Sequence, residues 1–76
     1  MHYTISILSD PHGGQQLNID KVGNQYLVGL RNEETGTYKH RRFDTLAEAE
    51  KKFLYLASCI INGNYSFEDR VKILEN

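Results

Sequence analysis

The sequence predicts a single α+β domain over residues 1–76, a two-layer sandwich in which two C-terminal helices pack on an antiparallel, four-stranded meander sheet (ββββαα). Three observations predict it. Four segments with the alternation or composition of strands occupy the first 43 residues. Short polar or glycine-containing turns separate them, which favours hairpins between neighbours. The remaining residues carry an apolar stripe at helical spacing, and such a stripe needs a sheet face to cover it.

The first predicted strand is the segment YTISILS, which alternates with Tyr3, Ile5 and Ile7 on one face. The segment DPHGG that follows must be a loop, because Asp-Pro and two glycines interrupt regular structure. A second strand begins at Leu17, and Gly23-Asn24 is typical of a two-residue hairpin in which both residues tolerate positive φ.

The third strand, QYLVGLR, places Tyr26, Val28 and Leu30 on one face and Leu27 on the other. After the polar turn NEETG, the fourth strand is TYKHRRF. If Phe43 of this strand points into the core, alternation puts Lys39 and Arg41 on the same face, and a bulge before the helix would relieve that conflict. Both arrangements are open.

The first helix is predicted from Thr45, where Glu48 completes a capping box, to the segment NGN with Gly63 as the left-handed residue after the helix. Ser66, with Asp69 three residues later, predicts the start of a second helix. The apolar stripe of the first helix consists of Leu46, Ala49, Phe53, Leu56, Ala57 and Ile60, and that of the second of Phe67, Val71 and Leu74.

Composition limits the function classes. The chain is 39% apolar and 25% charged, which is typical of an ordinary globular protein. Its net charge is −1, but residues 31–42 carry four Arg or Lys side chains against two Glu, a local charge of +2. A general duplex-DNA binder usually has a clear overall basic excess, which is absent here.

The sequence also predicts the cellular compartment of the protein. A single cysteine, Cys59, excludes an internal disulfide and fits a reducing compartment, where it packs as a small hydrophobe. The N-terminal segment lacks the features of a signal peptide, and no segment approaches the roughly 20 apolar residues needed to span a bilayer. We therefore expect a cytoplasmic protein, in the host cytoplasm if it is phage-encoded, with no membrane partner.

The sequence predicts no catalytic or metal site. His2, His12 and His40 lie in three separate segments without the paired spacing of a zinc site. His12 lies close to Asp10 and Ser9, but the members of a catalytic triad normally converge from different elements. We expect no enzyme activity, no metal and no cofactor.

The basic segment KHRR at residues 39–42 has two interpretations. Positive side chains on an edge strand discourage edge-to-edge aggregation. Alternatively, the segment contacts phosphates or an acidic protein surface, and Tyr38 beside it is of a type enriched in interfaces.

Residues 22–60 resemble the arm-type DNA-binding domain of tyrosine integrases. The resemblance lies in the basic run and in RRFDTLAEAEKKF, where Phe43 and Thr45 precede an alanine- and glutamate-rich helix start. In that family a three-stranded sheet enters the major groove, which implies Arg31, Lys39, Arg41 and Arg42 as DNA contacts. The first strand, the acidic balance and Glu33-Glu34 depart from the pattern.

The whole chain also resembles small phage anti-CRISPR proteins of the type I-F inhibitor kind. The order and lengths of the segments match, with ILS closing the first strand, RN after the third and RRFDT leading into the first helix. That family binds a Cas backbone subunit through its sheet face. The corresponding positions here, Ile7, Val22 and Arg31, lack the tyrosines and the acidic group used there.

These observations lead to one functional expectation and one alternative. We expect a non-enzymatic phage or mobile-element protein that inhibits a host protein or ribonucleoprotein complex, such as a CRISPR surveillance complex, by covering its surface. The alternative is a duplex-DNA-binding module. Reversing Arg41 and Arg42 to Glu is expected to abolish binding in either case, and no oligomeric state is predicted. The expected contact residues are Arg31, Tyr38, Lys39, Arg41 and Arg42.

Overall fold

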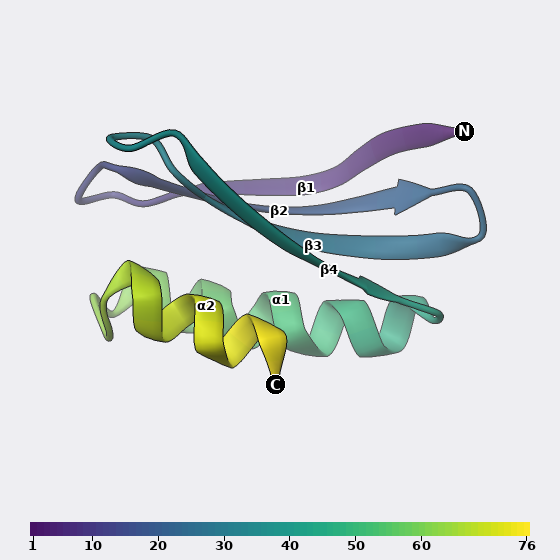
Figure 1. The fold of residues 1–76 in the computed structure, drawn as a ribbon. Coiled ribbons are helices and arrows are strands. Elements are labelled where there is room, and N and C mark those ends of the chain that lie inside the picture. The colour runs from purple at the N-terminus through teal and green to yellow at the C-terminus, as the bar shows by residue number, and fades with distance from the viewer.

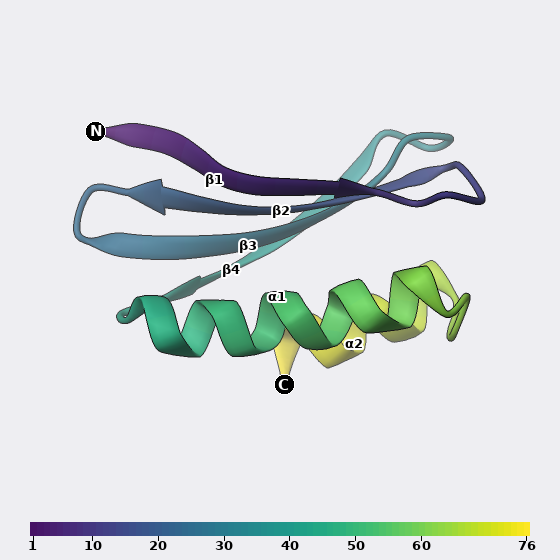
Figure 2. The ribbon, with the colours of Figure 1, turned by 180° about the vertical axis from the view of Figure 1, so that it is seen from behind.

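The computed structural model describes residues 1–76 and has the predicted ββββαα order. Both helices lie on one side of the sheet, so the opposite side is uncovered (Figures 1 and 2). No helix is both long enough and apolar enough to cross a membrane. The elements are β1 (His2–Ser9), β2 (Gln15–Val22), β3 (Gln25–Asn32), β4 (Thr37–Phe43), α1 (Leu46–Ile61) and α2 (Phe67–Glu75).

The sheet is a meander of order β1-β2-β3-β4 in which every neighbouring pair is antiparallel. Leu17 pairs with Leu30 and Ile19 with Val28, and all four side chains are buried. Because paired residues share a face of the sheet, these four form a continuous apolar floor. The helix residues that pack on it are Ala49, Phe53, Leu56, Ala57, Ile60, Phe67 and Leu74.

The β2–β3 connection is the predicted two-residue hairpin, with Val22 paired to Gln25. Gly23 has φ +60°, whereas Asn24 does not have a positive φ. Both residues tolerate positive φ, but only the first central position of this turn uses it.

The alternation predicted for β1 is also wrong. The register shifts between Thr4 and Ser6, so Ser6 pairs with Ile19 and Ile7 with Asn18. A bulge in this position transfers the residues after it to the opposite faces. Tyr3, Ile5 and Ile7 consequently do not form one buried face, and all three remain exposed.

The predicted helix ends are confirmed. Thr45 Oγ1 accepts from the backbone N–H of Glu48 at 3.2 Å, and Ser66 Oγ accepts from that of Asp69 at 3.2 Å. Gly63, after the end of α1, has φ +69°. In the predicted apolar stripes, only Leu46 is exposed, and Val71 is half-buried. Cys59 is buried, as expected.

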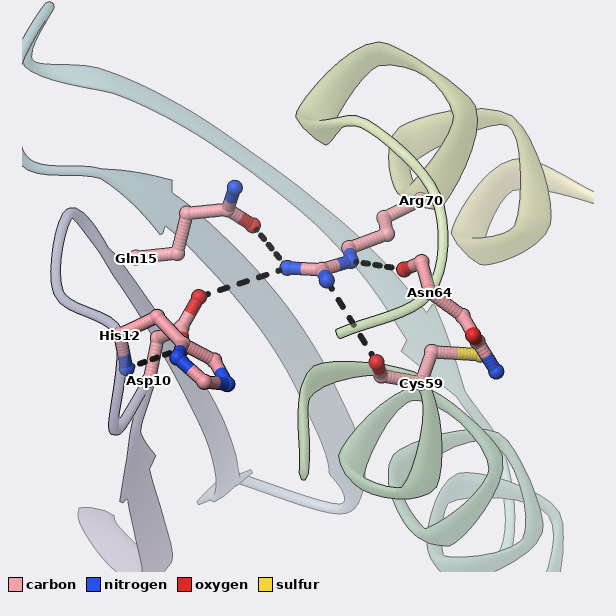
Figure 3. A network of polar contacts seen from close by, with 6 residues as sticks. All are labelled: Asp10, His12, Gln15, Cys59, Asn64 and Arg70. Carbon is pink, nitrogen blue, oxygen red and sulfur yellow. Dashed lines mark hydrogen bonds and ion pairs between the residues drawn. The ribbon is translucent and has the colours of Figure 1, made fainter. Parts of the chain in front are cut away.

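A buried arginine of α2 connects the loop between β1 and β2 to the end of α1 (Figure 3). Arg70 of α2 donates to Gln15 Oε1 and to the Asn64 carbonyl oxygen, each at 2.8 Å, and to the Cys59 carbonyl oxygen at 3.4 Å. Its guanidinium also lies 3.7 Å from an Asp10 carboxylate oxygen, and both side chains are more than nine-tenths buried. We call Arg70 and these partners the Arg70 clamp. It fixes the β1–β2 loop against the end of α1 and the start of α2.

Candidate functional site

The uncovered side of the sheet, which we call the open face, is the candidate functional surface. Side chains alternate along each strand, so the residues between the core positions point away from the helices. The strand register aligns them in three rows across β2, β3 and β4. These rows are Gln16–Arg31–Tyr38, Asn18–Gly29–His40 and Asp20–Leu27–Arg42.

The structure divides the five predicted contact residues between the two sides of the sheet. Arg31, Tyr38 and Arg42 lie on the open face. Lys39 pairs with Leu30, and Arg41 pairs with Val28, so both lie on the helix side. Thus β4 alternates without a bulge up to the buried Phe43, which settles the parity that was left open. The basic run is therefore not one surface.

Arg41 takes part in holding α2. Its Nη1 donates to the Leu74 carbonyl oxygen at 3.3 Å, and its guanidinium lies 4.8 Å from the centre of the Phe43 ring. Lys52 of α1 donates to the Ile73 carbonyl oxygen at 2.7 Å. Both cations thus satisfy carbonyl groups in the last turn of α2, which have no partner within their own helix.

These cations also affect one another. Burial lowers the pKa of Lys52, and the nearby charges of Arg41 and Lys51 lower it further. The same three residues line a groove of about 370 Å³ on the helix side, beside Phe43 and Tyr55. The positive charge of this groove faces away from the open face and cannot contribute to a contact made there.

Tyr38 lies flat over the backbone of β3 at Gly29. A Cβ atom on Gly29 would lie 2.6 Å from Tyr38 Cζ and 2.6 Å from Asn18 Oδ1, which is closer than real Cβ contacts allow. The Tyr38 hydroxyl donates to Asn18 Oδ1 at 3.4 Å. Glycine at position 29 therefore allows the ring to lie on the surface of the sheet, and a larger residue would displace it.

Two cationic or ionisable side chains adjoin this ring. The Arg31 guanidinium lies 4.8 Å from the ring centre, within the range of a cation–π contact. The His40 ring centre lies 5.7 Å from it at an interplanar angle of 34°. Arg42 follows His40 on the same face. We call Arg31, Tyr38, His40 and Arg42 the open-face cluster.

The single acid in the three rows is buried and has hydrogen-bond partners within the sheet. Asp20 is buried, with one carboxylate oxygen 2.8 Å from His2 Nε2 and the other accepting from Asn18 Nδ2 at 3.1 Å. A carboxylate with both oxygens engaged attracts other cations less. The exposed charges of the three rows are therefore the positive charges of Arg31 and Arg42, because Asp20 is buried.

The open face has no hollow. The three grooves of the molecule, of about 370, 360 and 240 Å³, are lined by residues from the helices and from the helix side or edges of the sheet. Small-molecule sites are usually concave, whereas protein and nucleic-acid surfaces can be recognised by a flat face. The geometry therefore favours a large partner.

Sequence reasoning missed three parts of this surface. His40 is not among the contact residues expected from the sequence, although its parity with Tyr38 and Arg42 indicates a shared face. Gly29 in the middle of a strand is itself a signal of close approach by another group. The contact of Asp20 with His2 had no signal in the sequence, because it depends on the register shift in β1.

Comparison of the chain with protein-family models, curated proteins and solved structures finds no match.

Gly29→Ala tests the packing of Tyr38. The added methyl group should displace the ring, separating it from Arg31 and His40. We expect the unfolding free energy to change by less than about 1 kcal/mol, because Tyr38 lies on an edge strand and alanine is favoured over glycine in a strand. Nuclear Overhauser contacts between the Tyr38 ring and the Gly29 Hα protons should be strong in the original protein and absent in the variant.

A second background provides the control. In a Tyr38→Leu protein the ring is already gone and only the contact with Asn18 remains, so Gly29→Ala should be less destabilising there than in the original protein. Ring contacts to residue 29 that persist unchanged in Gly29→Ala would contradict this account of Tyr38.

Proposed function

We propose that this chain is a non-enzymatic binding protein that covers an acidic surface of a macromolecular partner with its open face. The observation that carries the proposal is the open-face cluster, which lies on the uncovered side of the sheet. Tyrosine and arginine are the residue types that most often dominate the binding energy of interfaces.

The cluster is already ordered before a partner arrives. Tyr38 is held by its position over Gly29 and by Asn18, and Arg31 lies over the ring. Ordering a flexible side chain on binding costs about 0.5–1.5 kcal/mol, and much of this cost is avoided when the side chain is held in advance. The flat ring and the two arginines therefore suit a flat partner that presents carboxylates or phosphates.

The class of partner is proposed from the resemblance to anti-CRISPR proteins of the type I-F inhibitor kind. The partner would be the protein part of a host nucleoprotein complex, namely a CRISPR surveillance complex, and covering its surface would prevent target DNA from binding. The low charge of the chain supports a protein surface, because only two arginines of the open face are free to neutralise phosphates. Such an inhibitor, encoded by a phage or mobile element, would act in the host cytoplasm.

Duplex DNA is the alternative partner, and one observation favours it. Gln16, Asn18, Arg31 and Arg42 all lie on one side of a sheet backed by a helix, and these residue types bind base edges. In this alternative Lys39 and Arg41 are not among the contacts, because they point to the helix side.

Two measurements with the purified protein separate these functions. The first is target-DNA binding by a purified type I-F surveillance complex with increasing amounts of the protein. We expect inhibition that saturates as the protein occupies its site on the complex. The second is direct titration of duplex DNA at about 50 and 200 mM salt, where a DNA-binding module should lose affinity steeply as salt rises.

The outcomes are distinct. Inhibition without duplex binding supports the inhibitor. The alternative is established if the protein binds duplex DNA tightly and in a salt-dependent way, but has no effect on a surveillance complex that is given excess target DNA. An unaffected complex together with no duplex binding at about 50 mM salt overturns both.

A further inference from the structure

The two edges of the sheet differ in how they are protected. The exposed edge strand β4 carries Lys39, His40, Arg41 and Arg42, and charged side chains on an edge oppose pairing with another strand. The other edge strand, β1, has the sequence HYTISILS, which contains no Lys, Arg, Asp or Glu. Its only protective feature is the register shift between Thr4 and Ser6.

The unprotected edge is also apolar. Tyr3, Ile5 and Ile7 of β1 are 47%, 42% and 54% exposed, and Leu54 on the neighbouring flank of α1 is 63% exposed. A groove of about 240 Å³ runs between Ile5 and Ser6 of β1 and Phe53 and Leu54 of α1, and Glu50 is the one charged residue in its lining. Large apolar side chains grouped in this way usually mark an interaction site.

The helices do not cover the outer edge of this strand. Figures 1 and 2 show β1 at the margin of the sheet farthest from α1 and α2, while β2 and β3 lie over α1. The strand is hydrogen-bonded to β2 on one side, and its other side has no strand neighbour. Its outward N–H and C=O groups are therefore available to a further strand.

We propose that β1 pairs with β1 of a second copy of this chain, giving a dimer with a continuous eight-stranded sheet. Two identical strands related by a two-fold axis must pair antiparallel within one sheet, and this places the same residues of both copies at the joint. Charge favours β1–β1 pairing over β4–β4 pairing between copies, because β1 has no Lys, Arg, Asp or Glu and meets its own copy without like-charge repulsion.

Charge also limits the assembly to two copies. After β1 pairs with β1, each end of the enlarged sheet is a β4 strand. Two β4 edges would bring Lys39, His40, Arg41 and Arg42 against the same four residues, which is repulsive. The dimer therefore has no unprotected edge left, and a filament is not expected.

Both faces of the joint gain apolar contacts. Because of the register shift, Ile7 lies on the open face, whereas Ile5 lines the groove on the helix side with Leu54. The two-fold axis is perpendicular to the sheet, so the open faces of both copies lie on the same side. A dimer would thus present two open-face clusters to one partner, at opposite ends of its sheet.

The small size of the β1–β1 contact determines the protein concentrations at which the dimer should be tested. The eight residues of β1 and Leu54 are fewer than the roughly 20–30 residues per side of a standard interface. We expect a reversible dimer, so the mass of the full chain should be measured by sedimentation equilibrium from about 1 µM to about 1 mM, a range typical of weak interfaces. The mass should rise with concentration from that of the 8.8 kDa monomer to that of a dimer and stop there.

Ile7→Lys should raise the dissociation constant at least about tenfold, because it places a charge opposite its own copy on an otherwise uncharged strand. Tyr55→Glu is the matched control. Tyr55 is 52% exposed on the other flank of α1, beside Lys51 and Lys52, and the dissociation constant should not change there. Circular dichroism establishes that both variants are folded.

Amide hydrogen exchange gives an independent measurement on the unaltered protein. Alternate residues of β1 should exchange more slowly at high than at low protein concentration, and β4 amides should not respond. A monomer at every concentration overturns the proposal, as does a dimer whose protection appears in β4. Growth beyond a dimer overturns the closed arrangement, and an Ile7→Lys dimer of unchanged affinity overturns the assignment to β1.

Discussion

Replacing Arg70 with methionine is expected to lower the unfolding free energy by about 3–5 kcal/mol, the usual cost of removing one member of a buried ion pair. The Asp10 carboxylate, whose side chain is only 8% exposed, would lose its positive partner. Gln15 Oε1 and the carbonyl oxygens of Asn64 and Cys59 would each lose a donor. A small domain is typically stable by about 5–15 kcal/mol, so this variant loses a large share of its stability. Urea denaturation followed by circular dichroism measures the change.

Lys72→Met is the matched control for Arg70→Met. Lys72 lies two residues later on α2 and also faces an acid, Asp69 at 3.9 Å, but its side chain is 76% exposed. Ion pairs in such positions contribute about 0–1 kcal/mol, so this variant should have nearly the original stability. If Arg70→Met were within about 1 kcal/mol of Lys72→Met, the Arg70 clamp would not be the stabilising contact described above.

Reversal of Arg31 and Arg42 to Glu is expected to weaken partner binding at least about a hundredfold, since each arginine in an interface centre contributes about 2 kcal/mol or more. Both side chains are exposed, so the variant should fold. Affinity is measured for the surveillance complex and for duplex DNA, whichever binds the original protein. Loss of affinity for that partner locates the contact on the open face.

The adjacent residues Arg41 and Arg42 give the sharpest comparison. Arg42→Glu should weaken binding, whereas Arg41→Glu should leave affinity unchanged and lower stability by about 1 kcal/mol, because the hydrogen bond to the Leu74 carbonyl is lost. This revises the expectation from the sequence, in which both arginines belonged to one surface. The opposite pattern, with Arg41 required and Arg42 not, would move the contact to the helix side.

The sequence was sufficient for the order of the elements because their boundaries depend on local chemistry. Thr45 with Glu48, Ser66 with Asp69, and Gly63 each act through neighbours a few residues away. Tyr26, Val28 and Leu30 were correctly placed on one face for the same reason, since a strand without a bulge alternates strictly. These features need no knowledge of the tertiary structure.

The sequence did not predict which residues lie on the open face, because this depends on the tertiary structure. The parity of Lys39 to Arg42 is decided by the pairing of Val28 with Arg41, and the faces of β1 by a bulge that no residue type announces. Arg70 is three residues after Phe67 and four before Leu74, so its spacing did place it on the inner face of α2. Its partner Asp10 is 60 positions away in the sequence, and no local pattern connects them.

The Arg70 clamp has a consequence for how the chain matures during synthesis. The bond from Arg70 to Gln15 spans 55 positions, so it cannot form until the four strands and α1 have all been translated. While the C-terminal segment is still inside the ribosomal tunnel, Asp10 has no cation beside it, so the corner between the first two strands stays incomplete. Contacts between residues so far apart in the chain form late and slow the final step of folding. The loop between β1 and β2 is therefore fixed to the helices only after α2 has been synthesised.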